Sequence, residues 1–281
     1  MGSHIVGCDG TYSTVRRIIC GRMGTEWKPQ ALPVRFMGAN VILSGSTGRR
    51  MQDLDRAFCQ GGDASSGAFM LFAIQDTPEN NDREDRDTYL CQVVLSWPFR
   101  AGFLGRSEPT DVPETMAERL PLMREISRGW TSPFCDVVRE IPPDTAIQAI
   151  VLQDWVPTKG AWNNLTGRAA LIGDAAHPMT MCKLFRKVLQ VVNTDDCLDR
   201  GEAANHGVVD VQSWLEHHLP QLETMQAEAL NVSACVRYED EMVKRAAPAV
   251  LASRKACLDA HDNQGGIDGQ SPLVSKRKVD V

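Results

Sequence analysis

The sequence lacks any apolar run long enough to cross a bilayer, which takes about 18 consecutive residues. Its start, MGSHIVGCDG, lacks the basic region and the apolar stretch of a signal peptide. It also lacks an excess of positive charge, because 30 Lys and Arg stand against 36 Asp and Glu. We therefore expect no transmembrane segment and no general binding to nucleic acid or anionic lipid, although a local phosphate-binding pocket stays compatible with this charge.

Cysteine pairs of the CxxC type are absent as well. The 9 cysteines are scattered and odd in number, which is typical of reduced thiols rather than of a disulfide framework or a zinc ribbon. The sequence thus predicts a cytoplasmic protein. It also has neither a GxSxG nucleophile elbow nor an HExxH zinc motif, so two common hydrolase mechanisms find no support.

The first residues are typical of a strand, a turn and a helix. An apolar stretch over 4–7 is followed by Asp9-Gly10, and Ser13 is a good N-cap for a helix over 14–20. A short buried strand is an unusual beginning for a folded domain. The sequence therefore predicts that N-terminal sequence is missing from this fold.

Residues 31–155 have another pattern. Extended segments over 32–43, 67–74 and 88–98 are separated by polar turns, which favours an antiparallel sheet. Apolar spacing predicts a helix over 113–130, and the run over 145–156 is again typical of a strand.

A second strand-to-turn junction follows, where a buried strand over 169–172 runs into Gly173-Asp174. Helical spacing then predicts one helix over 201–219 and another over 222–261, broken near Pro248. The last residues contain Gly, Ser, Pro and Lys-Arg-Lys without a core pattern, and predict a disordered tail.

The two turns share a chemical feature, because each places an Asp beside a Gly at the carboxyl end of a buried strand. Ligands of open α/β sheets bind at that edge. Glycine lets the backbone approach a ligand closely, and a short carboxylate can accept hydrogen bonds from sugar hydroxyls. Either turn alone is an ordinary strand-to-helix connection, but the two together favour a binding site.

These segments resemble the class A flavoprotein monooxygenases, the para-hydroxybenzoate hydroxylase-like enzymes, in their fungal form. CDGTYSTVRR is similar to the family's Asp-Gly motif, and GRAALIGDAAHPMT to its Gly-Asp motif. RGEAANHGVVDV resembles the segment that follows, and YEDEMVKRAAPAVLASRKACLDAH resembles the C-terminal helix of fungal members.

The resemblance implies a mixed α/β (α+β) fold. It combines a partial Rossmann-like FAD-binding domain lacking its first βαβ half, an antiparallel-sheet substrate domain and C-terminal helices. The predicted division is a FAD-domain segment over 1–30, a substrate domain over 31–155, a second FAD-domain segment over 156–261 and a disordered tail over 262–281.

The resemblance also implies the chemistry. FAD is the expected cofactor, NAD(P)H the co-substrate, and O2 the oxidant for hydroxylation or epoxidation of a small aromatic or polycyclic metabolite, in secondary metabolism. A flavin C4a-hydroperoxide would carry the oxygen, so no catalytic protein nucleophile is expected. The sequence does not specify the substrate, the regiochemistry, the choice between NADH and NADPH, or the oligomeric state.

Cofactor-binding roles follow from the matched motifs. By resemblance, Asp9 and Gly10 bind the cofactor and Arg16 braces their turn. Gly173 and Asp174 would hold the ribityl and pyrophosphate region. A helix N-terminus suits a reduced, anionic flavin. The remaining predicted cofactor-binding residues are Pro178 near the ring, and Gly201, Ala204 and Asn205 beside the isoalloxazine.

Two departures from the family pattern stand out. No GxGxxG fingerprint is present, so the cradle for the FAD pyrophosphate is not encoded in these residues. In addition, residues 182–199 separate two motifs that almost adjoin in the family. We interpret them as an insertion, either a short retained intron or a genuine helical insertion. If these residues form a loop, the entropy of closing it lowers the stability of the fold by only on the order of 1 kcal/mol.

Other interpretations stay open. Glu202, His206 and Asp210 recur every four residues and could bind a metal, but a solvated or flavin-facing stripe is favoured and no metal is predicted. His177 is expected to pack or hydrogen-bond rather than to act as a base. Besides a monooxygenase, the chain could be a truncated, inactive family remnant or a non-catalytic module that binds apolar ligands.

Overall fold

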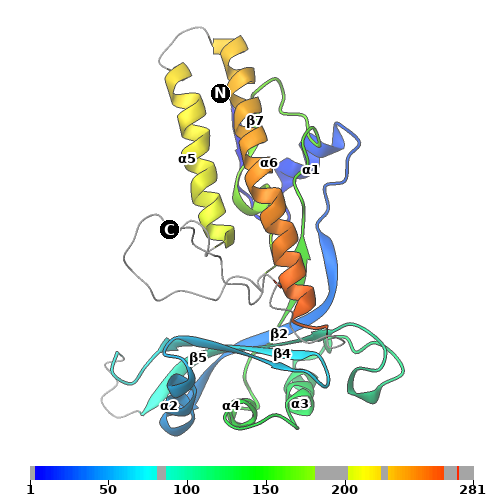
Figure 1. Cartoon of the computed structure of the whole chain (residues 1–281), viewed down its shortest axis with the longest axis vertical. Helices are drawn as coiled ribbons and strands as arrows, with labels where there is room; N and C mark the ends of the chain where they lie inside the picture. The colour runs from blue at the N-terminus through cyan, green and yellow to red at the C-terminus, as the bar shows by residue number, and fades with distance from the viewer. Residues whose placement is uncertain (1–3, 81–86, 181–201, 223–226, 263–270, 272–281) are drawn as a thin grey trace. The chain divides into compact units, whose positions relative to one another are not determined.

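The computed structural model in Figure 1 describes residues 4–80, 87–180, 202–222, 227–262 and 271. Two compact units divide the chain: Met1–Leu32 with Gln153–Cys257, and Pro33–Leu152 with Leu258–Val281. The finer four-part division proposed from the sequence stays a prediction. None of the helices in the described part is both long and apolar enough to cross a membrane.

The described part of the first unit is built on a two-stranded parallel sheet. β1 (Ile5–Gly7) pairs with β7 (Ala169–Leu171), with Ile5 opposite Ala169. The small side chains of β7 are buried, and the Tyr238 hydroxyl donates a hydrogen bond to the Leu171 carbonyl at 2.6 Å. Because β7 carries alanines, the helix that holds Tyr238 lies close to the strand.

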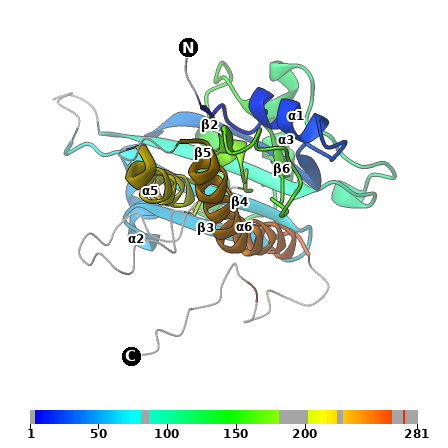
Figure 2. The ribbon, with the colours of Figure 1, turned by 90° about the horizontal axis from the view of Figure 1, so that it is seen from above.

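The described residues of this unit form three α-helices, α1 (Thr14–Gly21), α5 (Glu202–Leu222) and α6 (Ala227–Asp259), and the short 3-10 helix η2 (Gly173–Ala175). The Ser13 hydroxyl accepts a hydrogen bond from the Arg16 amide at 2.9 Å, which confirms the predicted N-cap of α1. Figures 1 and 2 show α5 and α6 side by side.

In the second unit, the described residues form a five-stranded sheet in the order β3-β4-β5-β2-β6. The registered pairs β3–β4, β4–β5 and β5–β2 are antiparallel, as the alternation of strands and turns predicted. One face packs its apolar side chains against α2, α3 and α4, and the core lies between them. The elements are β2 (Gln30–Ser44), α2 (Gly45–Leu54), β3 (Phe58–Asp63), β4 (Ala68–Asp76), β5 (Thr88–Pro98), η1 (Phe103–Gly105), α3 (Met116–Ile126), α4 (Phe134–Glu140) and β6 (Gln148–Asp154).

Two helix predictions need correction. Residues 222–261 do not break near Pro248, because α6 runs through it without interruption. Side chains on both sides of the proline, such as Met242 and Val250, are fully buried. We attribute the continuity to this packing, which offsets the hydrogen bond that proline removes. The helix predicted over 113–130 is also shorter, because α3 covers only Met116–Ile126.

Some predictions fall outside the described residues. Nothing is described for the insertion at 182–199. Of the tail at 262–281, only Asp262 and Ser271 are described, and the Ser271 hydroxyl donates to Asp259 at 2.5 Å.

Candidate functional site

The two Asp-Gly turns lie at the same edge of one sheet. Because β1 and β7 are parallel neighbours, the residues that follow them leave the sheet side by side. The Ile172 amide donates to the Gly7 carbonyl at 2.9 Å, so the pairing persists to the point where both turns begin. The fold thus brings together two motifs that are about 160 residues apart in the chain.

Asp9 caps the helix that follows its turn. Its carboxylate accepts hydrogen bonds from the Ser13 hydroxyl at 2.5 Å and from the amides of Thr14 at 2.7 Å and Val15 at 3.3 Å. Partial burial alone would raise the pKa of Asp9, but these hydrogen bonds outweigh it and lower the pKa. Asp9 therefore acts first on α1, where a carboxylate at the N-terminus is favourable.

Gly10 gives this turn its shape. Its φ of +79° is a left-handed conformation that side chains rarely adopt, and a Cβ added there would meet no atom within 4 Å. The space in front of the turn is therefore open.

Arg16 joins the two turns. Its guanidinium is fully buried and donates to the Asp174 carbonyl at 3.2 Å, to the Ala175 carbonyl at 2.8 Å and to the Thr11 carbonyl. Its Nε donates to the Trp27 carbonyl at 2.9 Å. Burial lowers the pKa of Arg16, and the carbonyl oxygens replace the lost water. One side chain therefore fixes the Thr11 turn against the Asp174 turn.

The Asp174 carboxylate is left available. It is exposed, and it makes no hydrogen bond with any described residue. Its neighbour Gly173 has a φ of +62°, and a Cβ added there would come within 3.9 Å of the Gly207 Cα in α5. The turn thus presents a free carboxylate beside the start of a long helix.

The structure describes some of the other residues that were predicted to bind the cofactor. Pro178 is buried, and its carbonyl accepts a hydrogen bond from the Trp155 amide at 3.3 Å. Asn205 is half-buried in the first turn of α5. Gly201 and the side chain of Ala204 lie outside the described residues.

A buried network behind the Gly-Asp turn was not predicted. Asp210 of α5 accepts hydrogen bonds from the Gly173 amide at 2.8 Å and from His177 Nε2 at 2.7 Å, and it pairs with Arg245 of α6. The four-residue spacing of His206 and Asp210 placed them on one helix face, but no sequence pattern pointed to Arg245. In the described part of the chain, no group of acidic, His and Cys side chains could hold a metal.

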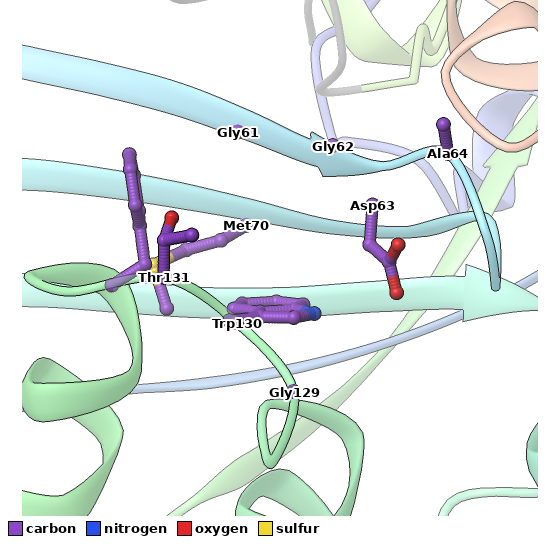
Figure 3. A pocket seen from close by; sticks show the side chains of 9 residues that line it. Gly61, Gly62, Asp63, Ala64, Met70, Gly129, Trp130 and Thr131 are labelled. Carbon is purple, nitrogen blue, oxygen red and sulfur yellow. The ribbon is translucent and has the colours of Figure 1, made fainter.

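Among the cavities lined by described residues, two lie away from the turns. The one in Figure 3, of about 250 Å³, belongs to the second unit; the β3 segment with Gly61 and Asp63 borders it, together with Trp130 and Phe134. Asp63 is already engaged, because it accepts hydrogen bonds from Ser65 and Ser66 of its own hairpin.

The other cavity, of about 270 Å³, lies in the first unit beside Trp162, Asn164 and Glu239. The Glu239 carboxylate accepts hydrogen bonds from Trp162 Nε1 at 2.7 Å and from Asn164 Nδ2 at 3.1 Å. Burial raises the pKa of Glu239, and the two hydrogen bonds only partly counter this shift.

Several known proteins are similar to this chain in sequence. No family model matches the chain. A "probable FAD-dependent monooxygenase" of Arthroderma benhamiae is 42% identical over 98% of this chain and 61% of its own length. The FAD-dependent monooxygenase dbaB of Emericella nidulans is 32% identical over 74% of this chain and 47% of its own length. The chain thus spans about half to three fifths of these relatives.

Solved structures support the fold. The 2,6-dihydroxypyridine-3-hydroxylase of Arthrobacter nicotinovorans superposes with a TM-score of 0.63 at 14% identity, over 99% of this chain and 63% of that one. A Klebsiella pneumoniae HpxO, complexed with FAD and uric acid, superposes with a TM-score of 0.57 at 17% identity, over 94% of this chain and 53% of that one. The mixed α/β fold expected from the resemblance is confirmed. The chain belongs to the family of FAD-dependent monooxygenases.

Proposed function

We propose that the protein is an FAD-dependent monooxygenase that uses NAD(P)H and O2 to hydroxylate or epoxidise a small aromatic or polycyclic metabolite. The observation that carries the proposal is the pair of turns joined by Arg16, with the Asp174 carboxylate free beside them. The related monooxygenases support it over an inactive remnant or a simple binding module. The scattered cysteines support a cytoplasmic location.

The residues at this edge fit a flavin in three respects. The open space at Gly10 lets a cofactor approach the backbone, and the Asp174 carboxylate can accept hydrogen bonds from ribityl hydroxyls. The start of α5, with Asn205 in its first turn, offers amides and partial positive charge to the ring. When bound, FAD supplies the redox and oxygen chemistry, and the protein supplies position and exclusion of water.

The second unit offers a surface for the organic substrate. The face of its sheet that does not pack on α2–α4 carries Asn40 and Gln75, whose side chains share a hydrogen bond of 3.2 Å. Polar groups of this kind, beside exposed apolar residues of the same face such as Ile42 and Leu90, can orient a planar metabolite. We assign substrate contact to this face.

Flavin binding by the purified chain is the direct test. After incubation with FAD and desalting, we expect visible absorbance of bound flavin. Asp174→Ala should weaken the FAD affinity about tenfold or more, because it removes hydrogen bonds to a charged acceptor. The matched control is Glu216→Ala, which removes an exposed carboxylate of α5 that bonds only Gln212 among the described residues.

The possible results separate the candidate functions. A colourless, aggregating product would favour the remnant, and a colourless monomer that binds an aromatic ligand would favour the binding module. Equal FAD affinities of the Asp174→Ala and wild-type chains would overturn the assignment of the Gly-Asp turn, even if flavin binds.

A further inference from the structure

Asp210 has an unusual position for a carboxylate, because it is fully buried between α5 and the Gly-Asp turn. Its Oδ2 accepts from the Gly173 amide at 2.8 Å and from His177 Nε2 at 2.7 Å, and its Oδ1 accepts from Arg245. Each oxygen is thus occupied by a donor from another segment of the chain. Burial alone would raise the pKa of Asp210, but the hydrogen bond and charge of His177, with the other donors, lower it.

Several donors of this network depend on Asp210. His177 is fully buried, its Nδ1 has no hydrogen-bond partner among the described residues, and its Nε2 bonds Asp210. Arg245 also donates to His206 of α5, so its guanidinium ties α6 to α5 through two acceptors. Without Asp210, a buried imidazole and a buried amide would both lose their acceptor, which is costly inside a protein.

Asp210 can influence cofactor binding only indirectly, through the residues that it contacts. Its two oxygens face Gly173, His177 and Arg245, and no part of it is exposed. The Gly173 amide points back toward α5, so this residue shapes the turn and leaves ligand contact to the next one, Asp174. A shift of about 1 Å at such a turn is enough to cost much of a binding interaction.

We propose that Asp210 is a positioning residue of the flavin site, which holds the Gly173 amide and the His177 ring so that the Asp174 carboxylate faces the cofactor. The inference rests on the proposed function, since it assumes that the Gly-Asp turn binds FAD. It extends that function to a residue on α5 and to its partner Arg245 on α6.

The chain offers a closely matched control for the test. Asp154 is also fully buried in the first unit and also pairs with an arginine of α6, namely Arg254 through a hydrogen bond of 2.8 Å. It bonds no residue of the Gly-Asp turn. Asp154→Asn therefore reproduces the loss of a buried charge without touching the turn.

The experiment compares Asp210→Asn, Asp154→Asn and the wild-type chain by two measurements. Amide hydrogen exchange without cofactor reports on Gly173, and we expect it to be about tenfold faster only in Asp210→Asn, because one charge-assisted hydrogen bond is lost. An FAD titration followed by visible circular dichroism should show about tenfold weaker affinity in the same variant alone. If Asp210→Asn does not fold, Asp210→Glu, which keeps the charge but shifts the carboxylate, takes its place, and it should show smaller changes in the same direction in both measurements.

Each outcome decides the inference. Unchanged exchange at Gly173 in Asp210→Asn would overturn it. So would equal losses of FAD affinity in the Asp210 and Asp154 variants, which would assign Asp210 to general stability. If the wild-type chain binds no FAD, the proposed function fails for this chain, and the exchange comparison alone decides whether Asp210 holds the turn.

Discussion

At the scale of single residues, Arg16 shows how a buried cation can organise a site without an acidic partner. It makes no ion pair among the described residues, and its hydrogen bonds go to four backbone carbonyls. The planar guanidinium also lies over the Trp155 ring, at 5.0 Å from the ring centroid. Only arginine supplies several donors in fixed directions together with a flat stacking surface.

Replacing Arg16 by lysine tests this account. Arg16→Lys keeps the charge but cannot reach carbonyls of both turns, so we expect the free energy of unfolding to fall by about 3 kcal/mol or more. Urea denaturation measures this loss. Arg17→Lys is the control, because the neighbouring Arg17 is exposed and its change should stay within about 0.5 kcal/mol. Similar small effects in both variants would refute a joining role for Arg16.

At the scale of elements, the strands and turns of the site could be predicted from the sequence. β1, α1 and β7 lie where the apolar runs and the Ser13 cap placed them, and β5 covers 88–98 as predicted. The local sequence specifies these elements, through the pattern of apolar and polar residues, through helix capping and through glycine at the turns. The Asp-Gly and Gly-Asp turns could be identified for the same reason, since their residues adjoin in sequence.

Elements formed by distant contacts were missed. α2 begins with Gly45-Ser46-Thr47-Gly48, which is typical of a loop, yet Glu140 from α4 accepts hydrogen bonds from Ser44 and Thr47. A Cβ at Gly48 would lie 2.2 Å from the Tyr89 ring, so glycine is needed there for packing. No local pattern reports either fact, and the same holds for the Asp210–Arg245 pair.

Helix α5 also differs from the pattern that predicted it. The apolar residues at helical spacing, Val208 and Val211, are 68% and 46% exposed, whereas Asp210 and Ser213 are buried. In the described structure the helix therefore turns the polar Asp210 toward the Gly-Asp turn, where it accepts from the Gly173 amide.

The close approach of α5 to the turn makes a prediction about Gly207. A Cβ there would lie 3.7 Å from the Gly173 Cα, which is ordinary contact. Gly207→Ala should therefore raise the free energy of unfolding by about 1 kcal/mol, through helix propensity. Gly173→Ala should instead lower it by about 1 to 2 kcal/mol, because of the positive φ. Thermal unfolding of both variants measures these two changes. If Gly207→Ala is instead less stable than the wild-type chain, α5 packs more tightly on the turn than the structure shows.

At the scale of the whole molecule, the parallel sheet is small for its class. Among the described residues it holds only β1 and β7, and Ile5 of β1 is 54% exposed. Parallel sheets are usually buried on both faces and hold more strands. The sequence also has no GxGxxG fingerprint, so the residues present offer no dedicated cradle for the pyrophosphate of FAD.

Supplying such a cradle should therefore strengthen FAD binding. We expect that fusing a strand–GxGxxG–helix unit before residue 1 adds a neighbour to β1 and tightens FAD at least tenfold, because phosphate oxygens then meet the amides of a helix N-terminus. The same fusion with its three glycines changed to valine is the control, since it keeps the added strand but blocks the close approach of the pyrophosphate. Fluorescence titration with FAD and with riboflavin separates the two effects: the gain should appear for FAD and be absent for riboflavin, which carries no phosphate. An equal gain for both ligands would show that the added segment acts by stabilising the sheet rather than by binding phosphate.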